Sequence, residues 1–177
     1  MSVKKICIDA MGIALFVVLT LCLQVPVFEN YYLCLGYIVM AFYLYYFGTA
    51  SGTLAGTVGV FLDCLLTSGI RGMPGWILGN AVIGILCGIA AKYARKQNKN
   101  SIKQIIMFAA VIVSTAIGIL AVKSLVEVAL YSLPFVLRLA NNIYAFVADV
   151  IILIFGFGIC ISGEKYWIKI IDQTIKK

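Results

Sequence analysis

The stretch VIGILCGIAAKYARKQNKNSIKQIIMFAAVIV, residues 82–113, decides the fold. It holds two apolar runs, and every charge between them is positive: Lys92, Arg95, Lys96, Lys99 and Lys103. A helix that crosses a bilayer needs about 20 mainly apolar residues, and cations concentrate in loops on one side of the membrane. The stretch therefore predicts two transmembrane helices joined by a basic loop.

Composition extends this interpretation to the whole chain. Of the 177 residues, 63% are hydrophobic and 12% are charged, with a mean hydropathy of +1.07, whereas soluble domains carry about 25% charged residues. We expect an all-α integral membrane protein that forms one domain over residues 1–177. The chain has no histidine and its six cysteines form no CxxC pair, so we expect buried apolar cysteines and neither a metal nor a cofactor.

Six spans are predicted, near residues 5–25, 33–48, 51–67, 76–94, 103–125 and 142–162. The second and third are separated by a turn that runs from Gly48 to Gly52. The first apolar run is longer than the core of a signal peptide, and no small-x-small cleavage site follows it. We therefore expect a compact bundle of six helices whose first helix is retained.

The distribution of lysine and arginine predicts the orientation. Eleven of the fourteen fall at the N-terminus, in the loop after span four and in the tail, leaving Arg71, Lys123 and Arg138 on the other side. The positive-inside rule then places both termini in the cytoplasm. From Glu164 onward the spacing of Ile168, Ile171 and Ile175 predicts an amphipathic helix in the inner interface.

The stretch TSGIRGMPGWILGN, residues 67–80, combines a lone cation, glycines and an indole ring on the predicted external side. Ionised groups in apolar surroundings are costly and usually line a cavity. Simpler roles remain open for single residues: Lys123 pairing with Glu127, Trp76 in the interfacial aromatic belt, and Arg71 and Arg138 facing water or lipid headgroups. For the whole set we predict a substrate site made of Glu29, Asn30, Tyr32, Arg71, Met73, Trp76, Asn80, Lys123, Glu127, Arg138 and Asn142.

A small-residue pair predicts a partner surface near the cytoplasm. Ala10 and Ala14 lie one turn apart on the first span, and small residues let another helix approach closely. The glycine pairs Gly52–Gly56 and Gly84–Gly88 fit packing within the bundle. With this motif, six helices and a glycine–proline loop before span four, the chain resembles the substrate-binding S components of energy-coupling factor (ECF) vitamin transporters.

The resemblance implies a function. Such a protein captures a vitamin at the outer side of a bacterial cell membrane, docks through helix one on a transmembrane coupling (T) component driven by two cytosolic ATPases, and topples to release substrate inside. It is a transporter subunit and not an enzyme, in line with the absence of Ser-His-Asp, HExxH and Walker motifs. Arg71, Lys123 and Arg138 favour a ligand with a carboxylate or another electron-rich group. Pantothenate, riboflavin and a queuosine precursor all stay open. The alternative is a self-sufficient facilitator or a structural membrane subunit.

Overall fold

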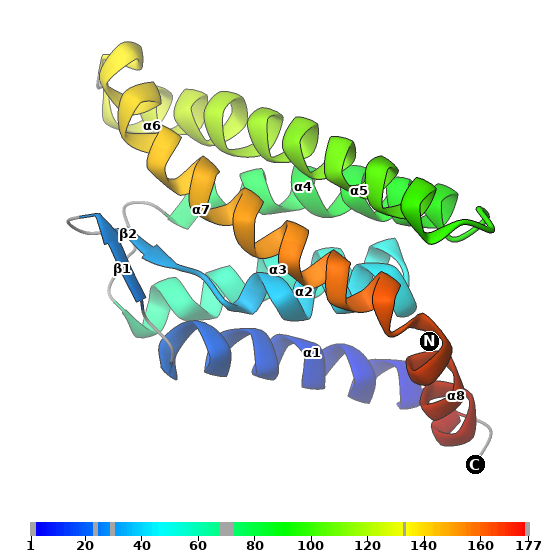
Figure 1. Cartoon of the computed structure of the whole chain (residues 1–177). Coiled ribbons are helices and arrows are strands. Elements are labelled where there is room, and N and C mark those ends of the chain that lie inside the picture. Colours follow the sequence, from blue (N-terminus) through cyan, green and yellow to red (C-terminus); the bar gives the residue numbers. More distant parts are fainter. Residues whose placement is uncertain (1–2, 23–24, 29–30, 68–72, 133, 176–177) are drawn as a thin grey trace.

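The computed structural model describes residues 3–22, 25–28, 31–67, 73–132 and 134–175, and it describes 25–28, 31–32 and 172–175 by their backbone alone. The elements in chain order are α1 (Val3–Cys22), β1 (Val25–Phe28), β2 (Tyr31–Leu33), α2 (Gly36–Tyr46), α3 (Thr49–Leu66), α4 (Met73–Ala94), α5 (Asn100–Thr115), the π-helical segment η1 (Ala116–Lys123), α6 (Ser124–Tyr131), α7 (Phe135–Ser162) and α8 (Glu164–Ile175). The long helices lie side by side as a bundle (Figure 1).

Within the described residues, five helices are long and apolar enough to cross a membrane: α1, α3, α4, the continuous helix Asn100–Tyr131 and α7. The prediction of a helical bundle is confirmed, with five candidate spans among the described residues, and the second predicted span, 33–48, contains a shorter apolar helix. Helix α2 has 11 residues, which corresponds to roughly 16 Å against a hydrocarbon core of about 30 Å. The chain reaches it in an extended conformation because β2 pairs antiparallel with β1, Val25 opposite Leu33.

The last two spans also differ from the prediction. The fifth continues to Tyr131 rather than ending near residue 125, and α7 begins at Phe135 rather than near 142. Pro134 precedes the first residue of α7, a position where the missing N–H of proline costs no helical hydrogen bond. Arg138, which precedes the predicted sixth span, and Asn142, its predicted first residue, therefore lie on the first turns of α7.

Glycines set the closest helix contacts inside the bundle. A Cβ atom built on Gly52 would lie 2.4 Å from Leu44 Cγ of α2, and one on Gly84 would lie 2.6 Å from Thr53 Oγ1 of α3. Such distances exclude any larger side chain without a shift of the neighbouring helix. The prediction that the Gly52–Gly56 and Gly84–Gly88 pairs pack within the bundle is confirmed.

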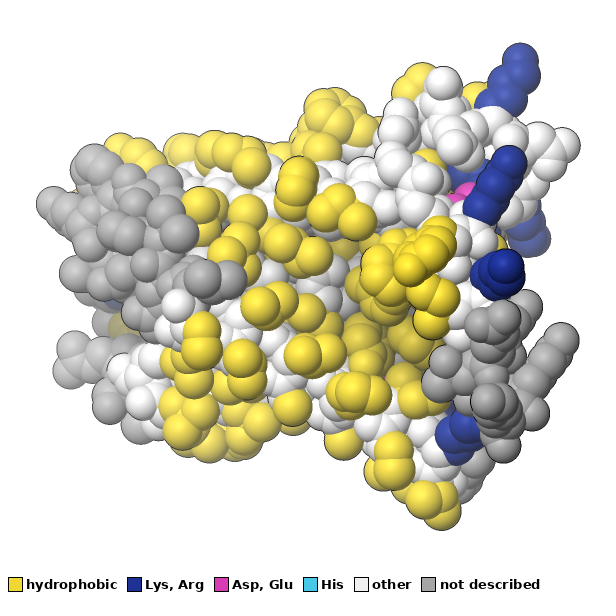
Figure 2. All heavy atoms as spheres, turned by 60° about the horizontal axis from the view of Figure 1, so that its bottom comes forward, with side chains coloured by type: hydrophobic (Ala, Val, Ile, Leu, Met, Phe, Trp, Pro, Cys, Tyr) yellow, Lys and Arg dark blue, Asp and Glu magenta, His cyan; other side chains and the backbone are white. Residues whose placement is uncertain are grey.

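The bundle has two chemically different ends. The basic end carries the start of α1, the α4–α5 connection and α8, and both chain termini lie there (Figure 1). Figure 2 shows Lys and Arg side chains gathered at this end, and hydrophobic side chains along the flank. The opposite end, called the hairpin end here, carries β1, β2, the start of α4 and α6 (Figure 1). The tail helix is confirmed as α8, and its Trp167 ring packs edge-on against Phe42, with centroids 5.3 Å apart.

Candidate functional site

An indole–phenol pair occupies the hairpin end. Trp76, on the first turn of α4, donates from Nε1 to the hydroxyl of Tyr37 on α2 at 3.0 Å. Tyr37 is fully buried, whereas Trp76 is half-buried. The hydrogen bond therefore orients an aromatic ring whose other parts stay accessible, an arrangement suited to stacking on a flat ligand.

A second group of polar side chains joins α6 to α7 at the same end. The amide of Asn142 donates from Nδ2 to Ser124 Oγ at 2.9 Å and to Glu127 Oε2 at 3.3 Å. Arg138 Nη1 lies 3.9 Å from the same carboxylate oxygen. Glu127 is 4% exposed and Asn142 is 1% exposed, so these bonds satisfy groups that would otherwise be costly to bury.

Lys123 lies between the two groups. Its charge interacts with the carboxylates of Glu127 and Asp149, and Asp149 in turn interacts with the Tyr37 hydroxyl. The start of α4 comes close because Gly75 has no side chain: a Cβ atom there would lie 3.1 Å from the Lys123 carbonyl oxygen. Gly75 thus lets the start of α4 pack closely against the end of η1.

Several buried polar atoms at this end have no hydrogen-bond partner among the described residues. They are Asn80 Oδ1, Asp63 Oδ1 and Arg138 Nε. Asn80 is fully buried and uses its Nδ2 to donate to the Trp76 carbonyl oxygen at 3.0 Å, so its own acceptor stays available. Unsatisfied buried groups are rare in native proteins and call for an explanation. A polar ligand held between α3, α4 and α7 would supply the missing partners.

The structure brings together six of the predicted site residues, namely Trp76, Asn80, Lys123, Glu127, Arg138 and Asn142. Met73 is half-buried and packs against the core. Glu29, Asn30 and Arg71 lie outside the described residues, and Tyr32 is described by its backbone alone. One simpler role was an ion pair between Lys123 and Glu127. The ion pair that Glu127 makes in the structure is with Arg138, whose Nη1 lies 3.9 Å from Glu127 Oε2.

Sequence reasoning missed two contributors, Tyr37 and Ser124. Tyr37 is one of ten tyrosines, and nothing in its spacing separates it from the neighbouring tyrosines of α2. Ser124 follows the π-helical segment, where helical periodicity does not predict which face a residue occupies.

No group of three or more His, Cys, Asp or Glu side chains that could hold a metal ion occurs within the described part of the chain.

The predicted partner surface lies on the outside of the bundle. Ala10 and Ala14 are exposed on α1, whereas Gly12 between them faces inward, where a Cβ atom would lie 2.6 Å from the Tyr43 ring. Exposed apolar side chains surround the two alanines, including Met11 and Leu15. Helix α1 therefore presents a smooth apolar face that a further helix could contact closely.

Comparison with known proteins adds the family. Two UPF0397 proteins from strains of Streptococcus thermophilus are each 27% identical over 108 residues, which is 60% of this chain and 59% of theirs. The chain thus spans less than two thirds of the length of these curated relatives. No solved structure matches significantly. A family model for the ECF-type riboflavin transporter S component matches residues 1–162. Because this match covers nearly the whole chain, the protein belongs to the S component family of ECF-type riboflavin transporters.

Proposed function

We propose that this chain captures riboflavin at the hairpin end, on the extracellular side, and delivers it inward after docking on a coupling protein and two ATPases. The family match is the observation that carries the proposal. The positive-inside rule supports the orientation, because the basic end would face the cytoplasm and the polar cluster the outside.

The charge balance at the hairpin end favours a neutral ligand. Arg138 pairs with Glu127 at 3.9 Å, the charge of Lys123 lies in the field of Glu127 and Asp149, and buried Asp63 adds a further acidic group. A ligand with a free carboxylate would enter a site in which acidic side chains already balance the charges of Lys123 and Arg138. Riboflavin carries no charge at neutral pH, which separates it from pantothenate on electrostatic grounds.

The hydrogen-bonding groups also suit a flavin. The isoalloxazine ring is flat and could stack on Trp76, while its imide N–H and the ribityl hydroxyls are donors for Asn80 Oδ1 and Asp63 Oδ1. Arg138 Nε could donate to a ring carbonyl. A site built to bond these groups would discriminate against analogues that lack them, because its buried polar atoms would then stay unpaired.

The ligand is tested on the purified protein. Mass spectrometry of small molecules that co-purify should find riboflavin, and titration should quench flavin fluorescence with saturation at one ligand per chain. Pantothenate at the same concentrations should not compete. Retention of a different vitamin, with no response to riboflavin, would refute the substrate.

The partners are tested on the exposed face of α1. Tryptophan at both Ala10 and Ala14 should abolish pull-down of the coupling protein and uptake, yet leave riboflavin affinity unchanged, because the two alanines lie near the basic end. Ala109, an exposed alanine on α5, offers a matched control: Ala109→Trp should assemble normally. Riboflavin uptake by the chain alone in ATPase-free liposomes would instead support a self-sufficient facilitator.

A further inference from the structure

Two apolar hollows lie along the half of α7 nearest the basic end. The first, about 450 Å³, lies between α5 and α7 and includes the buried side chains of Met107, Phe157 and Ile161. The second, about 550 Å³, lies between α7 and Trp167 of α8 and is bordered by Phe155. Both are lined mainly by apolar side chains and open outward.

Gly158 borders both hollows. A Cβ atom built on Gly158 would meet nothing within 4 Å, whereas one on Gly156, two residues earlier, would lie 3.0 Å from the Ala41 Cβ atom. Close helix packing therefore does not require a glycine at residue 158. Gly158 is the one residue that the linings of both hollows share, and the two hollows together are called the furrow here.

The furrow becomes polar where it reaches the basic end. Ser101 and Gln104 border the first hollow, and Ser162 borders the second. An ion pair between Lys103 of α5 and Glu164 of α8 links the two walls. The side chains of this pair are 8% and 16% exposed, so both charges are largely withdrawn from water.

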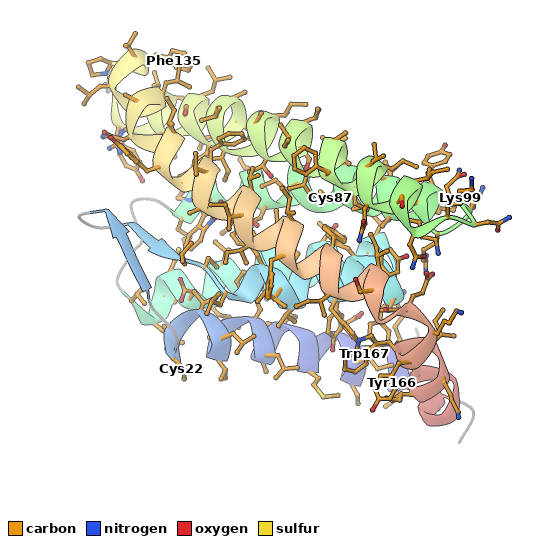
Figure 3. The ribbon with its side chains drawn as sticks, viewed as in Figure 1. Cys22, Cys87, Lys99, Phe135, Tyr166 and Trp167 are labelled. Atoms are coloured by element: carbon orange, nitrogen blue, oxygen red, sulfur yellow. The ribbon has the colours of Figure 1, made fainter. Side chains whose placement is uncertain are left out.

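Exposed cations lie close in sequence to residues that border the furrow, because Lys99 is two positions before Ser101 and Lys165 is two positions before Trp167. In Figure 3, Lys99 and Trp167 lie at the same end of the molecule. Of the acidic side chains described at this end, Asp9 is buried and Glu164 is held by Lys103. The exposed surface is therefore positive, through Lys92, Arg95, Lys96, Lys99, Lys165 and Lys169.

We propose that the furrow binds a phospholipid with an anionic headgroup, one acyl chain lying in each hollow and the phosphate at Ser101, Gln104 and the surrounding lysines. The lining residues of each hollow span two turns of α7, about 10 Å, enough for the upper part of an acyl chain. Basic pockets between helices at the cytoplasmic side are typical sites for such headgroups. The furrow is lined by residues of α5, α7 and α8, whereas Ala10 and Ala14 lie on α1, so the lipid and the coupling protein would use different helices.

Native mass spectrometry of the full chain tests this, with phosphatidylglycerol and phosphatidylcholine of identical acyl chains as probes. We expect phosphatidylglycerol to be retained at least tenfold more strongly. Lys99→Gln and Lys165→Gln should each weaken its retention about fivefold and leave phosphatidylcholine unchanged. Equal retention of the two lipids by the wild-type chain would overturn the proposal.

Substitutions at Gly158 test the contribution of the acyl chains to lipid binding separately from that of the headgroup. Gly158→Phe places a ring in open space, so the protein should fold, titrate riboflavin normally and lose at least tenfold in phosphatidylglycerol retention. Gly158→Ala is the matched control and should retain the lipid. Unchanged retention by Gly158→Phe would overturn the proposal. Unchanged retention together with failed assembly on the coupling protein would assign the furrow to a protein helix instead.

Discussion

Two tyrosines on α2 allow the same chemical change to be made in two environments. Tyr37 and Tyr45 are both fully buried, near opposite ends of one helix. The Tyr37 hydroxyl accepts from Trp76 Nε1 at 3.0 Å. The Tyr45 hydroxyl makes no hydrogen bond of good geometry within the described residues, although the Glu164 carboxylate lies in its neighbourhood. Replacement of each by phenylalanine removes one oxygen and leaves the ring in place.

We expect the two variants to differ in stability. In Tyr37→Phe the indole N–H loses its acceptor, and an unpaired buried donor costs about 1–3 kcal/mol. For a chain of this length that corresponds to a fall in melting temperature of roughly 2–12 °C. In Tyr45→Phe no bond is lost, so we expect a change within about 0.5 kcal/mol, of either sign.

Ligand binding provides the second readout. Tyr37→Phe releases the orientation of Trp76 and should weaken riboflavin binding about tenfold, equivalent to about 1.4 kcal/mol. Tyr45 lies toward the basic end, so Tyr45→Phe should bind normally. Thermal unfolding and flavin titration on the same preparations measure both effects. Equal behaviour of the two variants in both assays would refute the role assigned to the Trp76–Tyr37 bond.

Three further predictions follow from buried groups. In single-tryptophan variants, riboflavin should quench Trp76 and hardly affect Trp167, which lies at the basic end (Figure 3); quenching confined to Trp167 would place the ligand elsewhere. Both carboxylate oxygens of buried Asp9 lack hydrogen-bond partners among the described residues. Asp9→Asn should therefore keep or raise the melting temperature, because it removes a buried charge. A clear fall in melting temperature would show that the carboxylate is needed. A Cβ atom on Gly79 would lie 2.8 Å from the Gly118 carbonyl oxygen. Gly79→Val should therefore lower the free energy of unfolding by about 1–3 kcal/mol, measured by thermal unfolding. An unchanged melting temperature would mean that α4 and η1 can move apart without cost.

The long helices could be predicted from sequence because bilayer thickness demands long apolar runs. Helix α2 was overestimated because residues 33–35 are as apolar as the helix that follows, and hydropathy does not distinguish an extended entry from a helical one. The predicted sixth span begins near residue 142, later than α7, because Arg138, Asn141 and Asn142 interrupt the apolar run. A polar first turn is nevertheless compatible with a helix end near the membrane surface.

The candidate site could be predicted in its polar members but not in its connections. Charged and amide residues in apolar surroundings are conspicuous in a sequence, so Lys123, Glu127 and Asn142 were found. Their partners depend on how helices cross: the bond from Asn142 to Ser124 joins residues 18 positions apart, and that from Trp76 to Tyr37 joins residues 39 apart. Local periodicity carries no information at such separations.

The π-helical segment η1 has a consequence for chain length. Hydrogen bonds from residue i to i+5 accommodate an additional residue per turn without breaking the helix. In a regular α-helix, deletion of one residue turns everything after it by about 100°. Within Ala116–Lys123, the same deletion could convert the segment to α-helix and leave Glu127 facing Asn142. This segment can therefore absorb a length difference between relatives that would misalign the ligand site if it occurred elsewhere in the helix.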